Sequence, residues 1–196
     1  MLEQVDLDWS PAAADSDAGR FIRNAQRRIE QFQSENERIP GFEASNFHAA
    51  AGLLQAIQEQ RLAPGLRFCE WGSGFGVVTC LAAMAGFDAW GIETEAKLVG
   101  SSRQLALDYD LDVIFQQGSY KPDLTFGSDL ELPTESAESG RFPFDCDVVY
   151  IYPWPAEKAI VTQRFEQMAQ PGALLVSYQG GGRFRIQRAS TDSGSG

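Results

Sequence analysis

The residues whose types and spacing most clearly suggest ligand binding lie in a glycine-rich segment, residues 70–76, which reads EWGSGFG. It stands between a predicted apolar strand, 66–70, and a predicted apolar helix, 77–85. Glycine can adopt positive φ and lets a ligand approach the backbone closely, and the N-terminus of a helix presents unpaired N–H groups. A tight turn without a ligand usually needs one glycine rather than three, so the segment predicts a ligand-binding loop.

The acidic residue before the glycines helps to identify the ligand. A dinucleotide site of the NAD type requires GxGxxG, but Val77 or Thr79 occupies the last position. The Lys-Ser or Lys-Thr of a phosphate loop does not follow the glycines either. Glu70 would repel a pyrophosphate and attract a cation. S-adenosylmethionine (SAM) carries an ammonium and a sulfonium and no phosphate, so it suits this turn.

The strand and glycine segment resemble the first motif of class I SAM-dependent methyltransferases, a hydrophobic strand running into (D/E)xGxGxG. The resemblance implies a Rossmann-like fold and SAM as the cofactor. The cofactor-binding residues that it implies in this segment are Glu70, Gly72, Ser73, Gly74 and Gly76.

An acidic residue at the end of the second predicted strand extends the resemblance. In this family it holds both ribose hydroxyls, and Glu93 occupies that place, with Glu95 as the near alternative. A carboxylate accepts hydrogen bonds only and can take two O–H donors. Gly118 and Ser119 align with the adenine-contacting position, where the family commonly has Asp, so Ser119 departs from the pattern. The segment 170–174 (QPGAL) is similar to the family's approach to the fifth strand, and the resemblance covers roughly residues 42–178.

The substrate side is expected at the end of the fourth strand, where residues 152–155 read YPWP. This segment is similar to the (D/N)PP(Y/F/W) motif of enzymes that methylate amino nitrogens, with Tyr152 in place of Asp or Asn. Tyr152 and Trp154 are the candidate catalytic residues, because aromatic faces attract an amine or a sulfonium. The alternative is plain packing at a strand end. Methyl transfer from SAM is an in-line displacement that needs positioning rather than a protein nucleophile, and the lone His48 is interpreted as structural.

The elements that must position these residues alternate along the chain. An amphipathic helix is predicted from Asp17 to about Arg38, and Ser45 is the expected N-cap of a second helix that ends before Pro64. Strands are then predicted at 66–70, 89–92, 113–115, 147–152, 173–177 and 183–187, with helices at 77–85, 96–109 and 156–169. This alternation predicts an α/β fold with a mostly parallel sheet and crossover helices.

The domain organisation follows from this pattern. We expect a disordered tail over 1–16, N-terminal helices over 17–62, a SAM-binding methyltransferase domain over 63–188 and a disordered tail over 189–196. Class I enzymes usually finish with two more strands, so the C-terminal strands are expected to be truncated. Residues 121–146 break the rhythm with an excess of acidic residues, interpreted either as a solvated loop or as a rim that steers a basic acceptor.

Composition excludes several classes of protein. The net charge of −11 disfavours nucleic-acid binding, and a cluster of arginines in the first helix (Arg20, Arg23, Arg27 and Arg28) is interpreted as a solvated face. Three cysteines without CxxC spacing and one histidine predict no metal site. The sequence has no apolar run near the roughly 20 residues that span a bilayer and no basic, apolar leader, so we expect a cytoplasmic protein without a membrane partner.

The favoured function is therefore a SAM-dependent methyltransferase. Its compact size, its helical lead-in and its short tail are similar to small protein-lysine methyltransferases, which implies a protein lysine or another amine as acceptor. Methylation of a small molecule is the runner-up. A SAM-binding regulatory or interaction module without activity is the alternative from another class, and a nucleotide-binding oxidoreductase comes third.

Overall fold

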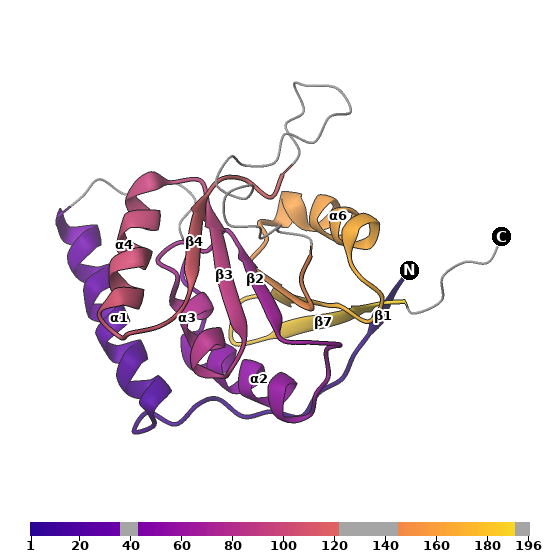
Figure 1. The fold of residues 1–196 in the computed structure, drawn as a ribbon, viewed down its shortest axis with the longest axis horizontal. Helices are drawn as coiled ribbons and strands as arrows, with labels where there is room; N and C mark the ends of the chain where they lie inside the picture. The colour runs from indigo at the N-terminus through magenta and orange to yellow at the C-terminus, as the bar shows by residue number, and fades with distance from the viewer. Residues whose placement is uncertain (36–42, 122–144, 191–196) are drawn as a thin grey trace.

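A single mixed sheet carries the fold (Figure 1). The computed structural model describes residues 1–35, 43–121 and 145–190, and its seven-stranded sheet has the order β1-β7-β6-β5-β2-β3-β4. The strands are β1 (Leu2–Gln4), β2 (Arg67–Trp71), β3 (Asp88–Glu93), β4 (Ile114–Gln117), β5 (Val148–Ile151), β6 (Leu174–Tyr178) and β7 (Phe184–Ala189). The five strands from β6 to β4 run parallel, whereas β7 pairs antiparallel with β6 and β1 antiparallel with β7. The predicted α/β fold with a mostly parallel sheet is confirmed.

Helices cover both faces of the sheet. The described helices are α1 (Asp17–Glu35), α2 (Phe47–Glu59), α3 (Val77–Met84), α4 (Ala96–Leu107), the short 3₁₀ helix η1 (Pro155–Glu157) and α6 (Lys158–Met168). Side chains of α1 to α4 form one apolar cluster with Phe68 and Val148, and α6 packs on the other face against Cys69 and Val149. β5 reads VVYI and is buried throughout, as expected of a strand covered on both faces, whereas the equally central β2 (RFCEW) carries Arg67 and Glu70.

The N-terminal segment corrects one prediction. Residues 1–16 were expected to be a disordered tail, yet Leu2–Gln4 pairs with β7 and Trp9 packs edge-on against Phe184, with ring centroids 5.4 Å apart. The segment also lies tightly on α2, because a Cβ added at Gly52 would stand 1.8 Å from the carbonyl oxygen of Ser10. Val5, Leu7 and Trp9 alternate with polar residues and pack against the core, so a local two-residue period was present in the sequence and the prediction missed it.

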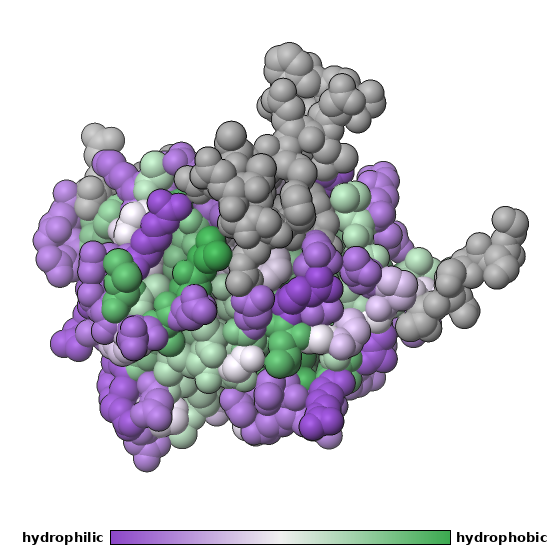
Figure 2. Space-filling view, viewed as in Figure 1, coloured by the Kyte–Doolittle hydropathy of each residue, from purple (hydrophilic) through white to green (hydrophobic). Residues whose placement is uncertain are grey.

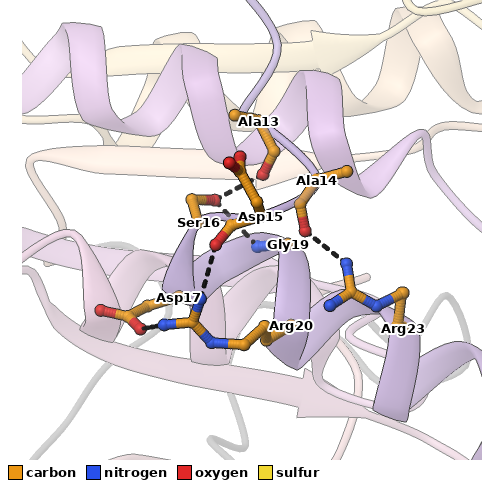
Figure 3. Close-up of polar contacts among 8 residues, drawn as sticks. All are labelled: Ala13, Ala14, Asp15, Ser16, Asp17, Gly19, Arg20 and Arg23. Atoms are coloured by element: carbon orange, nitrogen blue, oxygen red, sulfur yellow. Dashed lines mark hydrogen bonds and ion pairs between the residues drawn. The ribbon is translucent and has the colours of Figure 1, made fainter.

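The turn before α1 is held by polar contacts (Figure 3). Ser16 caps the helix by accepting from the backbone N–H of Gly19 at 3.0 Å. Two arginines of α1 donate to carbonyl oxygens of the preceding turn, Arg20 to Asp15 at 2.5 Å and Arg23 to Ala14. These arginines, expected only as a solvated helix face, therefore also fix the path of the N-terminal segment.

Three further boundaries differ from the prediction. The sheet is not truncated, because β7 continues to Ala189 and β1 adds a strand beyond it. The division at residue 62 is not a structural one, since α1 and α2 share a single apolar cluster with the sheet. The N-cap of α2 is Asn46 rather than Ser45, because the Asn46 side chain accepts from the N–H of Ala49 at 3.1 Å.

Residues 122–144 and 191–196, which hold most of the acidic segment and of the expected C-terminal tail, lie outside the described residues.

On the face drawn in Figure 2, hydrophilic side chains lie mainly around the edge of the described part, and hydrophobic ones gather between them. Of the helices that the structure describes, none combines the length and the apolar character needed to cross a membrane.

Candidate active site

The glycine loop connects β2 to α3 with three residues in the left-handed region. Gly72, Gly74 and Gly76 have φ values of 74°, 54° and 70°, which L side chains rarely adopt. The backbone N–H groups of Gly72 and Ser73 each donate to the carbonyl of Ile92 at 2.9 Å, so the loop is fixed against the end of β3. The predicted loop therefore exists, and its shape requires glycine.

Two of these glycines have different surroundings. A Cβ added at Gly72 would meet nothing within 4 Å, so this backbone faces open space. At Gly76 it would lie 2.4 Å from the ring of Phe115 and 2.7 Å from Cβ of Ser102. Gly72 is thus available to a ligand, whereas Gly76 is needed for packing between α3, α4 and β4.

A cleft of about 760 Å³ opens beside the loop, at the carboxyl ends of the parallel strands. Apart from Gly76, every residue predicted to bind cofactor or acceptor lines it: Glu70, Gly72, Ser73, Gly74, Glu93, Gly118, Ser119, Tyr152 and Trp154. Glu95 also lines the cleft, and His48 does not. Nδ1 of His48 lies 2.9 Å from the carbonyl oxygen of Ala12, which fits the structural interpretation of this histidine. The structure brings these residues together, and their binding roles stay predictions.

Glu93 holds the loop to the end of β3. Its carboxylate is 9% exposed, and Oε2 accepts from the N–H of Gly74 at 2.8 Å. Oε1 accepts from the N–H of Glu95 at 3.0 Å and from the hydroxyl of Thr94 at 3.2 Å. Glu95 is exposed, whereas Glu93 is held in place by three donors. These occupy three of the about four acceptor positions of a carboxylate, so Oε2 of Glu93 still has room for a ligand donor.

Glu70 lies on the same side of the cleft as Glu93 and the glycine loop, which together form the glycine-loop wall. Its Oε2 accepts from both the N–H of Thr79 (2.9 Å) and the Thr79 hydroxyl (2.6 Å). Burial raises the pKa of Glu70 to about 8, the bonds from Thr79 oppose this rise, and the charge of Glu93 adds to it. The carboxyl is therefore mostly protonated at neutral pH, and a cation nearby would favour its ionised form.

Two features of this wall were missed from the sequence. Gly91 in β3 makes room for the loop, since a Cβ there would lie 2.6 Å from Cβ of Ser73. The signal was a glycine in the middle of a strand, which often marks a close approach of another segment. The Ser73 hydroxyl is buried without a hydrogen-bond partner in the described structure, so it can still donate to a ligand or accept from one.

The far half of the cleft is aromatic. Tyr152 is 37% exposed and packs edge-on against Tyr178, with ring centroids 4.7 Å apart, and Trp154 is 46% exposed. Nearby, Tyr120 stacks on Trp71 at 5.1 Å and donates to Glu157 at 3.2 Å. Tyr120 was not singled out from the sequence, because its position depends on the stacking and not on a local pattern.

In β5, the buried Tyr150 hydroxyl donates to Oγ of Ser45 at 2.9 Å. Burial raises the pKa of Tyr150 well above its usual value, so it remains a donor. Ser45, which precedes α2, is thereby tied to the end of β5 and lines the cleft. The helical lead-in thus forms part of the site.

Comparisons with known proteins support the fold only. No protein-family model matches the chain, and no curated protein matches it by sequence. A methyltransferase from Geobacter sulfurreducens superposes with a TM-score of 0.59 at 15% identity, covering 89% of this chain and 92% of that one. An O-methyltransferase from Bacillus cereus in complex with SAH has a TM-score of 0.54 at 16% identity, covering 79% of this chain.

A putative O-methyltransferase from Klebsiella pneumoniae has a TM-score of 0.52 at 18% identity, covering 84% of this chain. The chain spans slightly less than two thirds of the length of the Bacillus and Klebsiella proteins, 65% and 66% respectively. The chain has the Rossmann-like fold of the class I SAM-dependent methyltransferases.

Proposed function

We propose that this protein is a SAM-dependent methyltransferase. The observation that carries the proposal is one wall of the cleft, where the exposed backbone of Gly72 lies beside two buried carboxyl groups, Glu70 and Glu93. This wall accepts hydrogen bonds and attracts cations. Among the described residues, the two basic side chains that line the cleft, Lys121 and Lys158, contact Glu157 and Gln179 instead. SAM, a cation with two ribose hydroxyls and no phosphate, fits that donor and acceptor set.

We assign the following roles in cofactor binding to the residues of the cleft. Glu93 accepts hydrogen bonds from the ribose hydroxyls, and Gly118 and Ser119 line the adenine side. Glu70 and the loop glycines receive the cationic amino-acid part. SAM supplies an electrophilic methyl group on a sulfonium, so the protein's main task is to position the acceptor in line with it.

We place the acceptor in the aromatic half of the cleft, against Tyr152 and Trp154. The names of two structural neighbours, O-methyltransferases, favour a hydroxyl acceptor over the protein lysine expected from the sequence. We propose that this hydroxyl belongs to a small molecule, which was the second interpretation of the sequence. We expect the Tyr152 hydroxyl to hydrogen-bond with the acceptor oxygen, while the acceptor's proton passes to a water molecule.

A SAM-binding module without activity is the second candidate. From the sequence, the apparently truncated sheet favoured it. The sheet has seven strands, with β7 and β1 beyond β6, so that argument no longer applies.

Two measurements test the proposal in sequence. Calorimetry should show that one SAM binds per chain, and absence of SAM binding by the folded protein would overturn the function. The protein is then incubated with methyl-labelled SAM and cell lysate, and the label is followed into small molecules, protein and nucleic acid. Label in small molecules supports the proposal, whereas SAM binding with no transfer to any fraction selects the inactive module.

A further inference from the structure

The aromatic half of the cleft is built around a firmly held tyrosine pair. Tyr178 is 5% exposed, its hydroxyl accepts from the N–H of Gly182 at 3.1 Å, and its ring packs edge-on against the partly exposed ring of Tyr152. Trp154 and Pro153 also line the cleft. Flat aromatic surfaces favour planar apolar ligands, because stacked or edge-to-face rings gain energy beyond simple area burial.

A lysine lies in the aromatic half of the cleft. Lys158, the first residue of α6, lines the cleft, and its Nζ donates to Oε1 of Gln179 at 2.8 Å. The Gln179 amide is neutral, so the contact orients the ammonium without neutralising it. An ammonium has three N–H donors, which leaves two for a ligand.

The other charges of the cleft are arranged differently. Lys121 also lines the cleft but is paired with Glu157, whereas Lys158 has no carboxylate partner in residues 1–35, 43–121 and 145–190. Three of the lining carboxyl groups (Glu70, Glu93 and Glu95) belong to the glycine-loop wall, and Glu43 belongs to the segment before α2. Among the described residues, the cleft therefore has its carboxyl groups mainly at the glycine end and has Lys158, without a carboxylate partner, beside the aromatic side chains.

We propose that Lys158 binds the carboxylate of a planar aromatic acceptor whose ring packs against Tyr152 and Trp154. The proposal rests on the proposed function and specifies the substrate class of the same site. An acceptor amine at this position would face a like charge, so the side chain of a protein lysine is disfavoured there.

The test measures binding to the protein saturated with SAH, using three aromatic carboxylates and their neutral amides. The pairs are benzoate and benzamide, 3,4-dihydroxybenzoate and its amide, and indole-3-acetate and its amide. We expect at least one carboxylate to bind about three- to tenfold more tightly than its amide, as a partly exposed ion pair allows. Lys158→Gln should remove this preference, and Lys158→Arg should keep most of it.

The matched control is Lys97→Gln, an exposed lysine of α4 that does not line the cleft. It should keep the full preference for the carboxylate. If no carboxylate binds more tightly than its amide, or if Lys158→Gln and Lys97→Gln behave alike, the proposal is wrong. A preference for the aromatic amine phenethylamine over benzoate would likewise overturn it. Failure of SAH itself to bind the parent protein is a separate result that refutes the proposed function.

Discussion

SAM binding should be linked to the ionisation of Glu70. The carboxyl is 6% exposed and lines the cleft, and burial raises its pKa to about 8. If the cationic cofactor requires the ionised form, the apparent Kd should fall about tenfold for each pH unit up to pH 8 and level off above it. Between pH 6 and pH 8 the affinity would then rise roughly 50-fold, which is the upper limit because a protonated Glu70 would also tolerate some binding.

The variant that tests this is Glu70→Gln, which has nearly the same shape and can still accept from Thr79. Calorimetry at several pH values, in two buffers of different ionisation enthalpy, measures both the affinity and the protons exchanged. Near pH 7 the parent should release close to one proton per SAM bound, and the variant should release less. The α-amino group of SAM also titrates near pH 8. The quantity compared is therefore the ratio of the Kd of the parent to the Kd of the variant at each pH. Identical pH profiles and identical proton counts in the two proteins would refute the reasoning.

The same carboxyl affects stability with a definite sign. Its pKa is higher in the folded chain, about 8, than the ordinary value of 4.5, so the cofactor-free protein binds more protons than the unfolded chain between these pH values. Stability should therefore decrease as the pH rises from about 4.5 to 8, with the loss complete above 8. Glu70→Gln should flatten this part of the curve in thermal unfolding, and an unchanged slope would contradict the assignment.

Three other predictions concern single residues. Glu93→Ala should weaken SAM about 5- to 150-fold, because a charge-assisted hydrogen bond contributes about 1–3 kcal/mol; calorimetry with Glu95→Ala as the control decides which acid holds the ribose. Gly72→Ala should weaken SAM with a small change in melting temperature, whereas Gly76→Ala should lower the melting temperature markedly, since only at Gly76 would the new methyl group overlap packed side chains. Trp9→Ala should cost about 2 kcal/mol in urea unfolding, because the half-buried ring packs on the sheet; unchanged stability would restore the interpretation of a loose tail.

The glycine loop shows how far sequence reasoning could reach. The strand, the loop and the helix were predictable because apolar runs and positive-φ glycines are local signals. The same signals could not separate Gly72 from Gly76, since both have left-handed φ and differ only in what surrounds them. The difference arises because Phe115 and Ser102, which are distant in sequence from the loop, pack against Gly76 and not against Gly72. In the same way, Lys158 and Gln179 meet only because α6 starts beside the end of β6.

The partner of the N-terminal strand could not be predicted from the local sequence. β1 has three residues, none of them buried, and its register is set by residues 187–189, at the other end of the chain. Pairing with β7 satisfies backbone groups that an edge strand would otherwise leave open, and this benefit exists only once the sheet has formed. This non-local contact also changes the functional argument. The sequence could place only one strand after residue 178, so it predicted an incomplete sheet, which was the argument for the alternative of an inactive binding module. With β1 in place the sheet has seven strands, and the question of activity depends on the acceptor half of the cleft alone.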